Sequence, residues 1–183
     1  MQSIRELYRI GTGPSSSHTM GPRKAATIFL ERNPGAARFE VTLYGSLAAT
    51  GRGHLTDVAI EDTLKPSAPV EIIWEPQTFL PFHPNGMRFR AFDADGNVAD
   101  DWTVFSVGGG ALAEEGKKGA VTSEEVYPLN TLSEILAWCQ ENGRSFWEYV
   151  EICEGPEIWD YLSKVWKTCL LYTSPSPRDL STS

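Results

Sequence analysis

Gly11-Thr-Gly-Pro-Ser-Ser-Ser-His-Thr-Met-Gly-Pro22 is the segment around which the rest of this chain has to be arranged. It places five hydroxyl side chains, one imidazole and five Gly or Pro residues in twelve positions. Glycine and proline interrupt regular structure, so the segment predicts a loop. Pro22 then begins a helix that continues to about Glu31, because proline is favoured in a first helical turn. The hydroxyl groups therefore lie just before a helix N-terminus.

This placement favours the binding of an anion. Unpaired backbone N–H groups and the positive end of the helix dipole attract a carboxylate or phosphate. His18 adds a group that exchanges a proton near neutral pH. A single capping side chain, such as that of Ser17 or Thr19, would satisfy the helix end. Three serines followed by His-Thr exceed that need, and we interpret the segment as one wall of a binding site.

The composition is that of an ordinary globular protein. In 183 residues, 41% are hydrophobic and 22% charged, enough for one domain with a core or one domain with an appendage. The formal net charge of −8 disfavours nucleic acid or an anionic membrane surface as the main partner. There is no apolar stretch of about 18 residues and no apolar signal core near Met1, so we expect a cytoplasmic protein.

Cysteine use agrees with a reducing compartment. Cys139, Cys153 and Cys169 are an odd number, lack C-x-x-C spacing and lie in helical patterns. We therefore predict no metal ligand in this chain.

The hydrophobic patterns predict an α+β fold, in which helices cover one face of a mixed sheet and a helical connector follows. Alternating residues indicate the strands, and Asp93–Asn97 forms the turn of a hairpin. Gly108-Gly-Gly110 marks a sharp bend or a close approach to a ligand, and lacks the context of a nucleotide-binding loop. Capping-box sequences at Ser3, Thr131 and Ser145 predict helix starts. The expected strands are 38–44, 70–74, 87–93 and 98–107, and the expected covering helices are 22–32 and 54–64.

The final stretch, residues 171–183, breaks the helical pattern. Serine and proline alternate there with almost no core-forming residue, which predicts disorder. The stretch also resembles a translated sequencing-adapter tail.

All three histidines occur in polar segments flanked by Gly or Pro. His18, His54 and His83 each avoid the apolar patterns in which a packing histidine would more often occur. The surrounding motifs, taken in order, resemble the β domain of the iron–sulfur L-serine dehydratases over roughly residues 1–128, and 129–170 resembles the connector that precedes the α domain in single-chain members. The motifs are Gly13–Pro22, Leu43–His54, Thr56-Asp57, His83–Met87, Asp93–Gly96 and Ser106–Gly110.

The resemblance implies a function in amino-acid catabolism and gluconeogenesis. Members convert L-serine to pyruvate and ammonia, and a [4Fe–4S] cluster on the α domain holds the substrate hydroxyl. This chain would then be a truncated part of an L-serine ammonia-lyase, inactive alone, with L-serine and the cluster-bearing α domain as partners and a homodimer as the full-length state. The cluster ligands are not present in this chain.

Residue chemistry and resemblance together name a candidate site. A dehydratase needs a holder for the carboxylate, a base for the Cα proton and a Lewis acid for the departing hydroxide. Asp57 could fix a histidine tautomer, and Leu55 stands where members commonly have a second glycine. The predicted catalytic residues are His54, His18 and His83, with the resemblance favouring the first two; the predicted substrate-binding residues are Ser15, Ser16, Ser17, Thr19, Asn85 and Gly86.

Two other functions compete with this one. The β domain also resembles allosteric substrate-binding domains of some phosphoglycerate dehydrogenases, so the chain could bind serine or another small anion and assist assembly without taking part in the chemistry. A Ser/His hydrolase is weaker, because no G-x-S-x-G elbow exists and Ser16 and His18 are too close in sequence for the usual triad.

Overall fold

The computed structural model describes residues 1–117 and 125–173, which divide into two compact units. One unit is Gly11–Thr122, and the other combines Met1–Ile10 with Ser123–Ser183. In the predicted disordered tail, residues 174–183 lie outside the described residues. No helix in the described ranges is long and apolar enough to cross a membrane.

The unit Gly11–Thr122 is built on one mixed sheet. Its strand order is β2-β1-β3-β4-β5, with β1 parallel to β2 and the other neighbours antiparallel. The four predicted strands and the hairpin are confirmed. The fifth strand was not predicted because three residues are too few to show an alternation. The strands are β1 (Arg38–Tyr44), β2 (Val70–Glu75), β3 (Gly86–Phe92), β4 (Val98–Gly108) and β5 (Ala111–Ala113).

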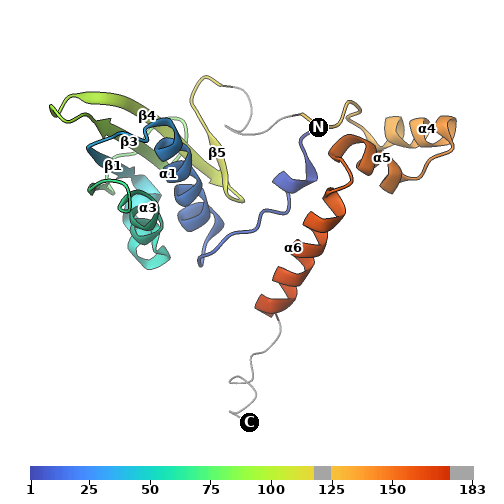
Figure 1. Ribbon diagram of the computed structural model, residues 1–183, viewed down its shortest axis with the longest axis horizontal. Coiled ribbons are helices and arrows are strands. Elements are labelled where there is room, and N and C mark those ends of the chain that lie inside the picture. Colours follow the sequence, from blue (N-terminus) through green and yellow to red (C-terminus); the bar gives the residue numbers. More distant parts are fainter. Residues whose placement is uncertain (118–124, 174–183) are drawn as a thin grey trace, which may run out of the picture. The chain divides into compact units, whose positions relative to one another are not determined.

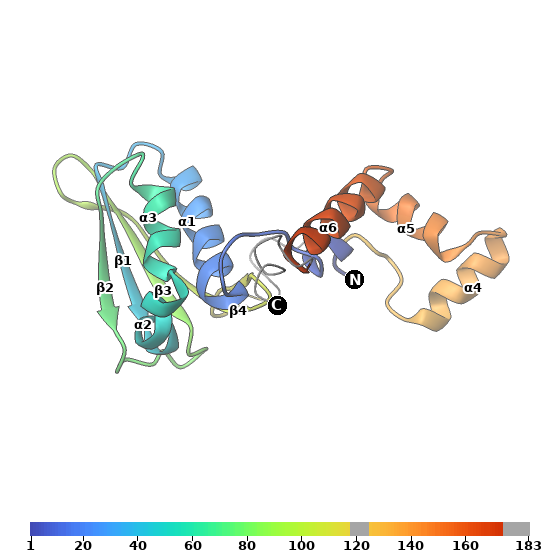
Figure 2. The ribbon, with the colours of Figure 1, turned by 90° about the horizontal axis from the view of Figure 1, so that it is seen from below.

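The helices of this unit cover one face of the sheet, as Figure 2 shows. They are α1 (Gly21–Arg32), α2 (Gly45–Thr50) and α3 (Thr56–Leu64). The predicted covering helices and the α+β class are confirmed. The short α2 was not predicted, because a run of small residues after a strand resembles a turn.

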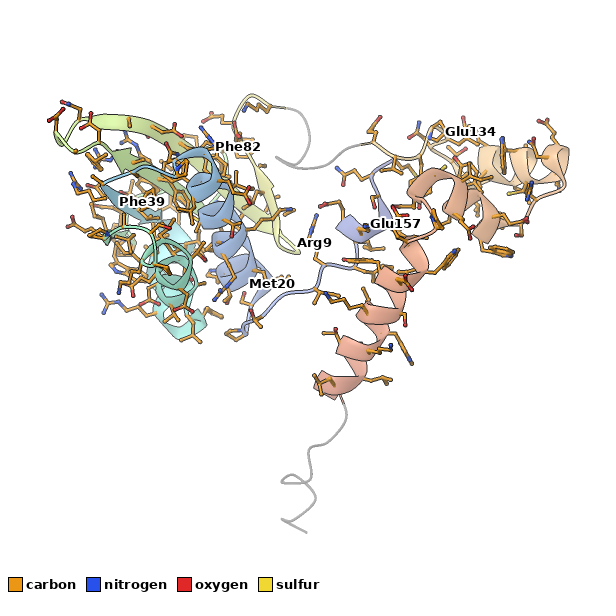
Figure 3. The ribbon with its side chains drawn as sticks, viewed as in Figure 1. Arg9, Met20, Phe39, Phe82, Glu134 and Glu157 are labelled. Carbon is orange, nitrogen blue, oxygen red and sulfur yellow. The ribbon has the colours of Figure 1, made fainter. Side chains whose placement is uncertain are left out.

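The core lies between these helices and the sheet. Phe29 of α1 is fully buried, and its ring lies 6.0 Å from that of Phe39 and 5.4 Å from that of Phe89. Phe39, labelled in Figure 3, belongs to the same face of β1 as Val41 and Leu43, which are also buried. Alternation along β1 thus supplies the apolar layer on which α1 packs.

The turn into β5 explains the glycine triplet. Gly108, Gly109 and Gly110 all have positive φ, at 104°, 57° and 75°. Such a run is strained for any residue with a Cβ. The triplet therefore serves the sharp bend that was one of its two predicted uses.

The second unit joins the N-terminus to three helices, α4 (Leu132–Asn142), α5 (Phe146–Glu154) and α6 (Ile158–Thr173), which Figure 1 shows. The ammonium group of Met1 donates to the Tyr127 carbonyl at 2.7 Å, and the Ser3 hydroxyl donates to Glu154 at 2.6 Å. The predicted helix after Ser3 is wrong in length, because only a 3-10 turn forms over Ile4–Glu6.

The helix starts of this unit follow the predicted capping boxes. At the start of α4, Thr131 and Glu134 exchange both capping hydrogen bonds; Figure 3 labels Glu134. The Glu148 carboxylate accepts from the N–H and the hydroxyl of Ser145. At Ser3 the hydroxyl instead accepts from the Arg5 N–H, so the third predicted box does not form.

Candidate functional site

The predicted loop contains a π-helical turn. From Gly11 the chain is irregular up to Ser15, forms a π-helix over Ser16–Met20 and continues directly into α1. The Ser15 hydroxyl caps this turn by accepting from the His18 N–H at 3.1 Å. Single π-helical turns are rare and often occur at functional sites. The sequence suggested Ser17 or Thr19 for capping; the structure uses Ser15 instead.

The turn brings His18 against His54. The two ring centroids lie 4.9 Å apart, with the ring planes tilted by 41°. His54 ends a 3-10 turn, Gly51–His54, which links α2 to α3. Both imidazoles are half-buried. Two of the three predicted catalytic histidines are therefore neighbours in space.

Hydroxyl groups hold both ring nitrogens of His18. Nδ1 lies 2.9 Å from the Ser17 hydroxyl, and Nε2 lies 3.2 Å from the hydroxyl of Ser46 at the start of α2. Burial lowers the pKa of His18, and the nearby charge of His54 lowers it further, against a smaller opposing effect of Ser46. The neutral form of His18 is therefore favoured near pH 7.

A backbone carbonyl fixes the tautomer of His54. Its Nδ1 lies 3.0 Å from the Thr50 carbonyl oxygen. A carbonyl oxygen only accepts hydrogen bonds, so Nδ1 carries the proton and, in the neutral ring, Nε2 keeps its lone pair. The sequence suggested Asp57 for this orienting part. Its carboxylate instead accepts from the Val58 N–H at 3.0 Å.

The predicted substrate-binding hydroxyls differ in their exposure. Ser16 is exposed, and Ser15 and Ser17 are half-buried. Thr19 is only 3% exposed, and its hydroxyl donates to the His54 carbonyl at 2.6 Å. The Thr19 hydroxyl is thus engaged within the fold.

His83 lies on a neighbouring loop whose backbone is hydrogen-bonded to the start of α2, near His18. The carbonyl of Pro84 accepts from the N–H of Ser46 at 3.0 Å. The His83 Nδ1 accepts from the Asn85 N–H at 3.1 Å. Asn85 donates from its side-chain amide to the Ser106 carbonyl at 3.2 Å, and Gly86 is buried at the start of β3.

Sequence reasoning missed several residues of the site. Ser46, Thr50 and Thr56 contact the histidines, yet each lies in a stretch whose pattern indicates only small residues or a helix start. Ser106 is fully buried beneath the π-helical turn, and a Cβ added to Gly21 would lie 2.3 Å from its hydroxyl oxygen. That oxygen has no hydrogen-bond partner within the described part of the chain. The Ser106–Gly110 motif was the one available signal for it.

The cysteines do not suit an iron–sulfur cluster. Cys139 is buried beside Tyr127 and Tyr149, Cys153 is half-buried and Cys169 is exposed. Within residues 1–117 and 125–173, no group of three or more His, Cys, Asp or Glu side chains could hold a metal ion. Cluster ligation requires such a convergent set of thiolates.

The serine dehydratase beta chain family matches this sequence over residues 3–72 and 61–117, which contain the whole histidine site. The chain belongs to this family. It is 30% identical to L-serine dehydratase 1 of Escherichia coli (strain K12) over 92% of its length, and 34% identical to the L-serine dehydratase of Streptomyces coelicolor over 78%. Identity to the L-serine dehydratase of Mycobacterium bovis is 35% over 75% of the chain.

These matches cover 47%, 41% and 39% of the respective relatives. The chain thus spans less than half the length of these serine dehydratases. His18 and His54 both lie within the residues that match the beta chain family.

Proposed function

We propose that this chain is the part of an L-serine ammonia-lyase that holds the substrate carboxylate and takes the Cα proton. The observation that carries the proposal is the His54 tautomer. The Thr50 carbonyl occupies Nδ1–H and leaves Nε2 as a proton acceptor, next to His18 and the serine-rich turn. A positioned imidazole with a free ring nitrogen is the usual general base.

The proposed chemistry begins at the substrate Cα. The Cα proton moves to His54 Nε2, the electron pair of the broken C–H bond forms a Cα–Cβ double bond, and hydroxide leaves Cβ. The aminoacrylate product then takes up water and gives pyruvate and ammonia. Hydroxide departure requires an electrophile, and we propose that a cluster-bearing α domain contributes it.

The serine-rich turn is the proposed holder of the carboxylate. Ser16 is exposed, and the first N–H groups of a helical turn have no partner within that turn. These donors, with Ser15 and Ser17 beside them, suit a carboxylate. Asn85 and Gly86 are proposed as further substrate contacts, because Pro84 joins their loop to Ser46. We retain His83 as a third candidate for proton transfer.

A reconstitution experiment tests the proposal. The 183-residue chain is mixed with a separately produced, cluster-loaded α domain of a serine dehydratase, and pyruvate is measured from L-serine. We expect turnover from the mixture and none from the chain alone. His54→Gln should lower kcat by about 100-fold or more, as general-base removal typically does. Thr63→Val, which removes a hydroxyl bonded within α3, is the matched control and should retain turnover.

The same assay separates catalysis from regulation. If His54→Gln keeps kcat but changes substrate saturation or cooperativity, the beta chain acts as a serine-binding regulatory domain. If the unaltered chain gives no pyruvate while a full-length relative does under the same conditions, the proposed function is wrong. The homodimer stays a prediction from the family resemblance.

A further inference from the structure

Two buried threonines connect the histidine segments reciprocally. Thr19, next to His18, donates its hydroxyl to the His54 carbonyl at 2.6 Å. Thr56, two residues after His54, donates its hydroxyl to the His18 carbonyl. The two side chains are 3% and 0% exposed, so water does not compete for either bond. Each histidine therefore has its backbone held by a threonine from the other segment.

Two glycines make room for these threonines. A Cβ added to Gly13 would lie 2.2 Å from Cγ2 of Thr19, and one added to Gly51 would lie 3.0 Å from Oγ1 of Thr56. Gly13 also has a φ of +118°, a backbone conformation that residues with a side chain rarely adopt. The backbone at Gly13 thus packs directly against the methyl group of Thr19, and the backbone at Gly51 packs against the hydroxyl group of Thr56.

Both threonine hydroxyls donate to backbone carbonyls of the histidines. Each accepting carbonyl belongs to the histidine itself, so a shift of either segment would break a buried hydrogen bond. The rings carry no direct hydrogen bond to each other that could set their spacing; His18 contacts Ser17 and Ser46, and His54 contacts the Thr50 carbonyl. The threonine pair joins the two backbones at the histidines.

We propose that Thr19 and Thr56 form a clasp that sets the spacing of His18 and His54, and that both are positioning residues for proton transfer. The inference rests on the proposed function and deepens it. It gives Thr19 a place inside the fold instead of the substrate contact predicted from the sequence. The clasp needs a hydroxyl at both positions, whereas packing alone needs only the volume of the side chain.

Thr19→Val and Thr56→Val test the clasp, because valine keeps the volume and removes the hydroxyl. The titration of the three histidines is followed by NMR on the 183-residue chain, with His83→Gln used to assign signals. Since burial and His54 lower the pKa of His18, parting of the rings should move that pKa upward, toward its ordinary value. In the reconstituted enzyme we expect kcat to fall about tenfold or more, with KM nearly unchanged.

Serine variants and a matched control distinguish the loss of the hydroxyl group from a general effect of substitution. Thr19→Ser and Thr56→Ser keep the hydroxyl and should keep both the His18 titration and kcat, whereas Thr63→Val should change neither. Valine variants that fold and titrate like the unaltered chain would overturn the clasp. A shifted His18 titration in a mixture that never makes pyruvate would overturn the proposed function and leave the clasp standing.

A measurement on the unaltered chain covers the case in which the valine variants do not fold. Buried, hydrogen-bonded hydroxyl protons exchange slowly with solvent, so those of Thr19 and Thr56 should exchange at least tenfold more slowly than that of exposed Thr12. Equal exchange rates would show that the hydroxyls are not held, and would overturn the clasp without any substitution.

Discussion

The imidazole rings of His18 and His54 lie 4.9 Å apart, one on the turn before α1 and the other at the end of the 3-10 turn before α3. At this spacing a proton on one ring opposes a proton on the other. Burial and the His54 charge accordingly lower the pKa of His18, while the Thr50 carbonyl holds a proton on Nδ1 of His54. The pair is therefore arranged to keep at least one ring neutral near pH 7.

The lowered pKa of His18 predicts a loss of stability in mild acid. The unfolded chain binds this proton more readily than the folded chain, so the contribution is present above the ordinary pKa of about 6.5 and is lost as the pH falls toward the folded value. Between pH 7.5 and 5.5, the free energy of unfolding should fall less in His18→Gln than in the unaltered chain. Urea unfolding followed by the ring NMR signals of the remaining histidines measures the difference.

His83→Gln is the control for this experiment, since it removes another histidine from the unit Gly11–Thr122 and leaves the His18–His54 pair. Since the pair is intact, this variant should keep the loss of stability that comes from His18. Equal losses in His18→Gln and His83→Gln would contradict the role given to His18.

Among the non-glycine residues that the structure describes, Leu55 has a positive φ, at 57°. It directly follows His54. The left-handed conformation costs a residue with a Cβ about 1 kcal/mol or more. Leu55 is 47% exposed, so little packing is lost on its removal. Glycine removes this strain but loses more backbone entropy on folding than leucine does. As the net effect, Leu55→Gly should raise the free energy of unfolding by about 0.5 kcal/mol. Leu55→Ala keeps the strained φ and should give no gain; a gain as large as that of glycine would refute the explanation.

The fold was predictable from the sequence to a greater extent than the site. Phe39, Val41 and Leu43 alternate with polar residues, and this pattern alone identifies β1 and its buried face. The site depends on contacts without a pattern, such as the Thr50 carbonyl on His54 or the Ser46 hydroxyl on His18. Backbone carbonyls and single hydroxyls can be assigned to a histidine only when the turns between strands and helices are known. The sequence identified the histidines and left their partners open.

Gly21 and Ser106 should behave as a coupled pair. A Cβ at position 21 would lie 2.3 Å from the Ser106 hydroxyl oxygen, so Gly21→Ala should lower the free energy of unfolding by about 2 kcal/mol, a typical overpacking cost. Ser106→Ala removes a buried oxygen that has no partner among the described residues, and should be neutral or stabilising by up to about 1 kcal/mol.

The double variant Gly21→Ala/Ser106→Ala decides whether this contact causes the loss. It should recover much of the stability lost in Gly21→Ala, and urea unfolding of the four proteins gives the coupling energy. Additive effects would mean that Gly21 is required for another reason. Gly35→Ala is a suitable control, because a Cβ there would meet nothing within 4 Å.

The face of the sheet away from the helices carries two ion pairs that differ in burial. The side chains of Arg90 and Glu40 are 29% and 10% exposed, whereas those of Arg88 and Asp101 are 42% and 37% exposed. Arg90→Met leaves the Glu40 carboxylate buried without its partner, and should lower the free energy of unfolding by about 2 to 3 kcal/mol. Glu40→Leu/Arg90→Met removes both charges and should recover most of that loss.

Arg88→Met in the exposed pair should lower the free energy of unfolding by less than about 1 kcal/mol, because solvent screens an exposed pair. Urea unfolding of the four chains provides the comparison, and equal losses in Arg90→Met and Arg88→Met would show that burial does not set the strength of these pairs.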